Sequence, residues 1–202
     1  KIKKFSIISG ISNRKYRNYS IKMLLNNDGK ATASKRFLSQ MDLGFSNLRP
    51  QEQDINESIF PANIPETIKE SFLKEHANEK MYLVDSVHKV LLRDGTISHQ
   101  PFDFEKMESD GTIKIFDLSG PIIDTLMNGY TLIIDELDAK LHPLLTKRIV
   151  NIFNSEKGNP YNAQLIFATH DTNLLNIDTL RRDQIWFIDK DKKDEASRLN
   201  RL

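Results

Sequence analysis

Two apolar runs in the second half of the chain each end in residues that carry chemistry. Residues 131–134 (TLII) lead directly into Asp135 and Glu136, and residues 165–168 (LIFA) lead, after one threonine, into His170. Runs of this kind without alternation are typical of strands covered on both faces, as in a parallel sheet, where ligands gather beyond the carboxyl ends. If both strands run parallel, we expect Asp135, Glu136 and His170 to share one edge of the sheet.

From residue 108 onward, helical periodicity alternates with apolar runs. The pattern predicts strands at 130–135, 163–168 and 184–189, and helices at 110–127, 143–155 and near 172–180. This alternation predicts an α/β fold with a parallel-strand core. Pro121 removes a hydrogen-bond donor within the first helix, and we expect it to kink or divide that helix near Gly120. We expect Trp186 to fill the sheet core.

The first 107 residues follow a different pattern. Apolar positions recur at helical spacing across 15–43, with a break at 26–29, and Pro65 is well placed to begin another helix. Strand-forming residues then lie between 81 and 92, and Asp94-Gly95 is a hairpin turn signal. We therefore predict a mainly helical region at 1–78, a β-hairpin region at 79–107, and the α/β portion at 108–202.

Composition narrows the class of protein. With 202 residues, 39% hydrophobic and 28% charged, the chain has the balance of a soluble globular protein. No apolar run approaches the roughly 20 residues that span a bilayer, so we expect no membrane contact and a cytoplasmic location. The absence of cysteine excludes disulfides, zinc thiolate sites and cysteine nucleophiles.

The net charge of +1 hides an asymmetry. Residues 1–40 carry ten Lys and Arg against one acid, Asp28, which makes this part +9, while the remaining 19 bases and 27 acids make the rest −8. Such a basic segment can bind the phosphates of nucleic acid. A solvated helical face lying against the acidic remainder explains the same charges at least as well.

The acidic pair suits phosphoryl transfer. Such a site needs one carboxylate to hold Mg²⁺, usually through water, and another to orient and deprotonate the attacking water. Asp135 and Glu136 supply both at a strand end, and the imidazole of His170 can reach a γ-phosphate oxygen. Each residue alone also has a simpler reading, because strands often end in acids at the surface and a histidine can cap a helix.

A third segment, Glu108-Ser109-Asp110-Gly111-Thr112, precedes the helix at 110–127. Ser109 or Asp110 can cap that helix, and Gly111 lets an anion approach the free N–H groups. An ordinary capping sequence is the alternative.

Together these segments resemble a known family. Residues 131–142 (TLIIDELDAKLH) look like a Walker B motif with a following D-loop, residues 165–171 (LIFATHD) resemble a switch-histidine strand, and ESDGT resembles a variant signature motif of ATP-binding-cassette ATPases. The match is to bacterial abortive-infection, anti-phage ATPases of the ABC-type AAA class, which are related to SMC-like repair ATPases and overcoming-lysogenization-defect nucleases. Gln164 and residues 180–187 (LRRDQIWF) extend it. Leu118-Ser119-Gly120 also reads like a signature, but it lies within the helical pattern, so we place the signature at Ser109.

The resemblance implies roles for individual residues. Asp135 would hold the Mg²⁺ shell, Glu136 would be the catalytic base, and His170 would sense the γ-phosphate of ATP. Nucleotide contacts would come from Ser109, Asp110, Gly111 and Thr112 of the signature and from Asp138, Lys140 and His142 of the D-loop. In such ATPases one subunit's signature closes over nucleotide held by its partner, so the resemblance implies a homodimer or higher homo-oligomer.

One motif of the family is missing. No GxxxxGK[ST] occurs in the chain, and Asn27-Asp28-Gly29-Lys30 is only a turn. Without backbone N–H groups and a lysine around the phosphates, most of the binding energy for ATP is absent. The sequence begins with Lys1, and we expect it to be a piece of a longer protein whose P-loop lies in an N-terminal segment. We predict that this chain alone neither binds nor hydrolyses ATP appreciably.

Two functions remain open at this stage. The first is half of an ATPase that dimerises around ATP–Mg²⁺ and gates a nuclease or toxin effector in phage defence. The second is a nucleotide-independent module that binds DNA or a protein and retains the motifs as relics. An SMC-like repair ATPase would need long heptad segments, and the sequence contains none.

Overall fold

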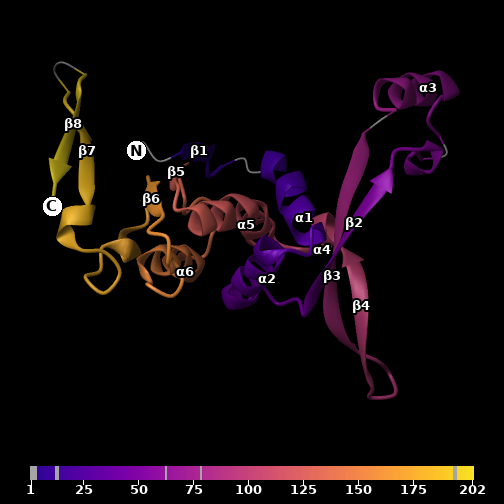
Figure 1. Ribbon diagram of the computed structural model, residues 1–202, viewed down its shortest axis with the longest axis horizontal. Helices are drawn as coiled ribbons and strands as arrows, with labels where there is room; N and C mark the ends of the chain where they lie inside the picture. The colour runs from indigo at the N-terminus through magenta and orange to yellow at the C-terminus, as the bar shows by residue number, and fades with distance from the viewer. Residues whose placement is uncertain (1–3, 12–13, 62, 78, 193–194) are drawn as a thin grey trace. The chain divides into compact units, whose positions relative to one another are not determined.

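The computed structural model describes residues 4–11, 14–61, 63–77, 79–192 and 195–202 (Figure 1). The chain divides into two compact units. The parallel-sheet unit contains the described residues of 1–12 and 125–202, and the hairpin unit contains those of 13–124. Helix α5 (Asp110–Asn128) carries the chain from the second unit into the first.

The parallel-sheet unit is built on three strands in the order β1 (Phe5–Ser9), β5 (Thr131–Asp135) and β6 (Gln164–Phe167). All pairs are parallel, with Ile7 opposite Ile133 and Ile133 opposite Ile166. Helix α6 (Pro143–Asn154) connects β5 to β6 and begins with proline at its first turn, where no N–H is needed. The predicted α/β fold with a parallel-strand core is confirmed, while the pattern did not predict β1.

The two faces of this sheet differ in burial. Ile8, Leu132 and Ile134 are buried, whereas Ile7 is 65% exposed and Ile166 is 55% exposed. Successive strand residues point to opposite faces, so one face belongs to the core and the other is open. The expectation that both strands are covered on both faces is therefore wrong. The apolar runs mark an apolar surface on each face, but within the described residues only one is covered.

The C-terminal part also departs from expectation. The predicted helix near 172–180 is reduced to a 3-10 turn at Thr172–Leu174, and another 3-10 turn follows at Arg182–Gln184. The predicted strand at 184–189 is β7 (Trp186–Lys190), which pairs antiparallel with β8 (Ser197–Arg201) in a separate two-stranded sheet. Trp186 is 51% exposed, so its assignment to the sheet core is wrong. The aromatic and apolar residues at 184–189 predict a strand. They do not show which strand it pairs with or which layer, if any, covers it.

The hairpin unit contains the predicted helices and hairpin. Its elements are a 3-10 turn at Arg14–Tyr16, α1 (Arg17–Leu25), α2 (Gly29–Met41), β2 (Asn47–Asp54), a 3-10 turn at Glu57–Ile59, α3 (Glu66–Glu75), β3 (Lys80–Leu91), β4 (Ile97–Asp103) and α4 (Phe104–Met107). Strands β2, β3 and β4 form one antiparallel sheet, in which the long β3–β4 hairpin is evident in Figure 1. The sequence pattern did not predict β2. Asp28 caps α2 by accepting N–H bonds from Lys30 and Ala31, as expected for a turn without a phosphate cradle.

Pro121 lies inside α5 and does not divide it. A proline at this position leaves the carbonyl of Asp117 without its helical donor. The hydroxyl of Ser20, on α1, donates to that carbonyl at 3.1 Å and accepts the N–H of Gly120 at 3.0 Å. A side chain at Gly120 would place its Cβ 2.7 Å from the Tyr19 ring and 2.8 Å from Ser20 Oγ. Gly120 thus allows α1 to approach α5, which gives the Leu118-Ser119-Gly120 segment a packing role.

Part of the basic N-terminal charge is neutralised within the hairpin unit. The buried guanidinium of Arg17 makes a bidentate bond to Asp117 (2.9 and 3.1 Å) and also pairs with Glu105. Burial raises the pKa of Asp117, and the bonds from Arg17 offset part of that rise. Lys30 likewise pairs with an acid, Asp124, on α5. These contacts support the interpretation in which basic helices lie against acidic partners.

Candidate active site

The ends of β5 and β6 meet at one edge of the parallel sheet. The N–H of Ala168 donates to Ile134 O at 3.0 Å, and the N–H of Leu137 donates to Ala168 O at 3.0 Å. The segments that follow β5 and β6 therefore stay hydrogen-bonded to each other just past the strands. Asp135-Glu136 lies on the first segment and Thr169-His170 on the second. The predicted parallel arrangement is confirmed, and the acidic pair and the imidazole leave the sheet at the same edge.

Strand β1 supplies a third end at this edge. Ser9 lies opposite Asp135, and the N–H of Gly10 donates to Asp135 O at 2.5 Å. A Cβ at Gly10 would lie 2.0 Å from the carbonyl oxygen of Glu136, so only glycine allows this approach. Sequence reasoning missed Gly10, although a glycine directly after the short segment 5–9 (FSIIS) was an available signal of a strand end.

Backbone strain is concentrated in the loop after β5. Glu136 has φ +52° and Lys140 has φ +63°, both in the left-handed region that non-glycine residues seldom occupy. Leu137, between them, is fully buried and fastens the loop to the core. Strain of this kind costs about 1–3 kcal/mol per residue and persists where surrounding contacts enforce it, often at functional sites. These contacts hold the backbone of Glu136 in one conformation, from which its carboxylate extends.

Asp138 connects this loop to the histidine segment. Its Oδ1 accepts the backbone N–H of His170 at 3.3 Å, and its carboxylate also accepts the Thr169 hydroxyl. Burial by itself would raise the pKa of Asp138, but these hydrogen bonds and the His170 charge outweigh it and hold the pKa below its usual value. The carboxylate is therefore ionised at neutral pH and holds the two strand-end segments together.

The two histidines of this unit have different surroundings. His142 is the N-cap of α6, where its Nδ1 accepts the N–H of Leu144 at 3.3 Å. His170 is exposed and lines a pocket of about 640 Å³ between β6 and residues 184–187. Neither Asp135 nor Glu136 is among the residues that line that pocket. His142 therefore caps α6, whereas His170 lies against a pocket.

The residues predicted to form the signature, 109–112, belong to the hairpin unit. Ser109 Oγ accepts the N–H of Thr112 at 3.2 Å and lies 3.0 Å from the Thr112 hydroxyl, so Ser109 caps α5 as expected. Asp110 and Gly111 form the first turn of this 19-residue helix. Glu108, just before the cap, is paired with His88 of β3.

No cluster of three or more His, Cys, Asp or Glu side chains able to hold a metal occurs in the described part of the chain. Mg²⁺ commonly keeps several waters and binds through one or two carboxylates and the substrate phosphates. Asp135, exposed at the end of β5, offers one such carboxylate.

A family model matches residues 24–176, about three quarters of the chain, and is described as "AAA domain, putative AbiEii toxin, Type IV TA system". The chain belongs to this AAA family. The matched region includes the signature residues, the loop after β5 and His170. The general expectation of an AAA-type ATPase domain is therefore confirmed.

Solved structures are also similar to this AAA domain. One belongs to work described as "Structural biochemistry of ATP-driven dimerization and DNA stimulated activation of SMC ATPases". The identity is 16%, the similarity covers 85% of this chain and 84% of that one, and the TM-score is 0.43. No curated protein matches the chain. None of the helices among the described residues is long and apolar enough to span a membrane.

Proposed function

We propose that this AAA domain supplies the hydrolytic half of an ATPase site. The observation that carries the proposal is the parallel pairing of β5 and β6, which brings Asp135, Glu136 and His170 to one sheet edge. Membership of the AAA family makes a nucleotide the ligand to expect there. The left-handed backbone at Glu136 lies in the loop that follows β5, and strain of this kind is often found at functional sites.

Each side chain has a distinct role in this proposal. Glu136 orients the attacking water and accepts its proton, and His170 donates a hydrogen bond to the γ-phosphate. Asp135 holds Mg²⁺ through its water shell, and Mg²⁺ neutralises charge on the phosphates when bound. Asp138 keeps the Glu136 loop and the His170 segment together, through its bond to the His170 N–H. Lys140 and His142 belong to the same loop and are proposed to face a second subunit.

No P-loop motif occurs in the 202 residues, so the proposal requires a phosphate cradle from another segment. We propose that an N-terminal P-loop segment of a longer protein completes the site. The Ser109–Thr112 turn, at the N-terminus of α5, then contacts nucleotide that is bound by a second copy of the protein. The active form is therefore a homodimer or higher oligomer. Coupling to a nuclease or toxin effector in cytoplasmic phage defence is the biological role we propose, and it rests on family resemblance.

Calorimetry tests whether ATP binding requires the P-loop segment. Titration of ATP–Mg²⁺ into the 202-residue chain should give no micromolar binding, and the protein joined to its P-loop segment should bind. The Asp135→Asn variant of the joined protein provides the matched comparison, since it should bind ATP with a weaker dependence on Mg²⁺. Micromolar binding by the short chain alone would show that the phosphate cradle lies within it.

The alternative is a nucleotide-independent DNA-binding module. It relies on the basic segment at 1–40, but Arg17 and Lys30 are already engaged with acids of α5. Arg14 pairs with Glu105, while Lys15, Lys22, Lys35 and Arg36 are exposed. Filter binding at two salt concentrations separates the two functions, because strong salt-sensitive DNA binding without ATP would favour the alternative.

A further inference from the structure

Glu108, the residue before the signature serine, has an almost buried carboxylate. Its side chain is 6% exposed, and Oε1 lies 2.7 Å from Nε2 of His88 on β3. A buried carboxylate without a hydrogen-bond donor is costly, so this contact stabilises the position of Glu108. The two residues are 20 positions apart in sequence, and the contact ties the antiparallel sheet to the start of α5.

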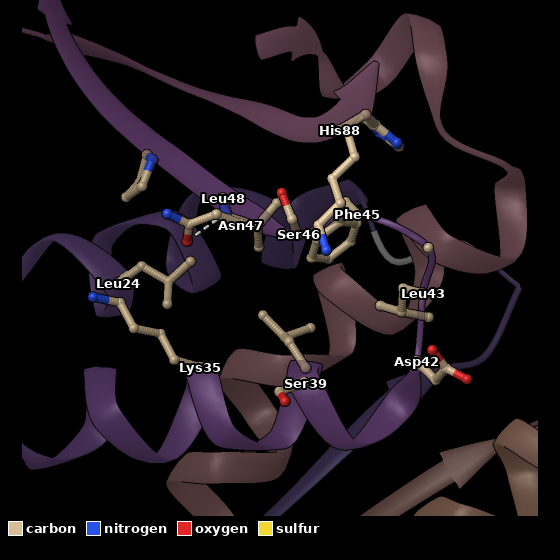
Figure 2. Close-up of a pocket in the computed structure, with 14 residues that line it drawn as sticks. Leu24, Lys35, Ser39, Asp42, Leu43, Phe45, Ser46, Asn47, Leu48 and His88 are labelled. Carbon is tan, nitrogen blue, oxygen red and sulfur yellow. Dashed lines mark hydrogen bonds between the residues drawn. The ribbon is translucent and has the colours of Figure 1, made fainter. Parts of the chain in front are cut away.

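Polar contacts set the orientation of the His88 ring. Nε2 also lies 3.2 Å from the hydroxyl of Ser86, which is fully buried on the same strand. Phe102 of β4 meets the ring edge to face, with centroids 5.7 Å apart. His88 also lines a pocket of about 410 Å³ that lies between α2 and the start of β2 (Figure 2). Because part of its surroundings is a pocket and not packed side chains, the ring depends on Ser86 and Glu108 for its direction.

Glu108 links the His88 ring to the turn at Ser109–Thr112. It is extended, with φ −87° and ψ 153°, and its N–H donates to Phe104 O at 3.1 Å. The next residue, Ser109, holds the first turn of α5 through the N–H of Thr112. Because Glu108 adjoins Ser109 along the backbone, a change in its position acts directly on the residue that caps α5.

We infer that His88 is a positioning residue for the signature turn: by donating to Glu108 it holds Ser109 and Thr112 in the orientation that meets nucleotide on a second copy. This inference rests on the proposed function of the signature. In this inference His88 acts through Glu108 and not by contacting nucleotide itself. Its effect is on the closing of the site, because nucleotide is first held by the P-loop of the other subunit.

Two measurements test the inference. In the protein joined to its P-loop segment, His88→Ala should lower kcat roughly tenfold or more, as expected when a reacting group is displaced, with KM for ATP unchanged within about twofold. His88→Gln keeps a donor near Nε2 and should restore most of the turnover. His99→Ala, an exposed histidine on the neighbouring strand β4, is the matched control and should behave as wild type.

Hydrogen exchange on the 202-residue chain reads the same link without ATP. The Thr112 amide should exchange roughly fivefold faster in His88→Ala, the change expected for a weakened helix cap, and not in His99→Ala. Normal Thr112 protection in His88→Ala, or equal damage from the Gln and Ala variants, would overturn the inference. If Ser109→Arg leaves turnover unchanged, the signature's proposed function fails instead, and the exchange result still decides whether His88 orders the turn.

Discussion

The bond between Ser20 and the Asp117 carbonyl yields a quantitative prediction. Ser20→Ala removes the donor that replaces the missing N–H of Pro121 and also the acceptor for Gly120 N–H. Both backbone groups belong to buried residues. Leaving a buried polar group unsatisfied costs about 1–3 kcal/mol, so we expect Ser20→Ala to lower the free energy of unfolding by about 2–4 kcal/mol.

A double-mutant cycle isolates the cause. Pro121→Ala gives the Asp117 carbonyl an ordinary helical donor, so Ser20→Ala should cost at least about 1 kcal/mol less in that background. Ser34→Ala is the matched control, because the Ser34 hydroxyl is fully buried on α2 without a hydrogen-bond partner. Its removal should change stability by no more than about 0.5 kcal/mol.

The assay is urea unfolding followed by far-ultraviolet circular dichroism, which reports the helices of the hairpin unit. Equal costs for Ser20→Ala and Ser34→Ala would refute the reasoning. An unchanged cost of Ser20→Ala in the Pro121→Ala background would also refute it, since the hydroxyl would then not be replacing the proline's missing donor.

Three further predictions concern the two units. Gly10→Ala should lower the unfolding midpoint in urea strongly, because its Cβ would lie 2.0 Å from the Glu136 carbonyl; an unaffected midpoint would show that β1 does not pack as described. Arg17→Leu should destabilise by about 3–5 kcal/mol by leaving Asp117 buried without its cation, and a second change, Asp117→Asn, should recover part of the loss. The Asp138 pKa is lowered in the folded state, so its contribution to stability is present above about pH 4 and is lost as pH falls through the folded pKa. Asp138→Asn should therefore flatten the fall in melting temperature below about pH 4, and a wild-type acid profile in this variant would contradict the pKa direction.

Local signals explain what the sequence pattern predicted correctly. Strands β5 and β6 are short apolar runs that end in polar residues, and both signals are contiguous in sequence. Caps and breaks are local too, as at Asp28 before α2 and Pro143 at the start of α6. The edge of the candidate site followed from these elements, because parallel neighbours deliver their carboxyl ends to one side.

Long-range contacts explain what the pattern missed. The 97-residue separation of Ser20 and Asp117 hides the partner that lets α5 continue through Pro121. Strand β1 can be recognised only from its pairing with β5, more than 120 residues away in sequence. The need for glycine at position 10 is visible only from its contact with the Glu136 carbonyl. Trp186 reads as a core residue because apolar strand patterns do not specify which layer covers them. The boundaries proposed at 78 and 107 stay a prediction, as do the roles of the individual site residues.

Single-turnover hydrolysis by the Glu136→Gln variant of the protein joined to its P-loop segment tests the central claim most directly. Removal of a general base should lower the hydrolysis rate by a factor of about 10² or more, while ATP binding persists and the dimer accumulates in its closed form. Hydrolysis at the wild-type rate would remove Glu136 from the base role and contradict the assignment of this sheet edge as the catalytic site.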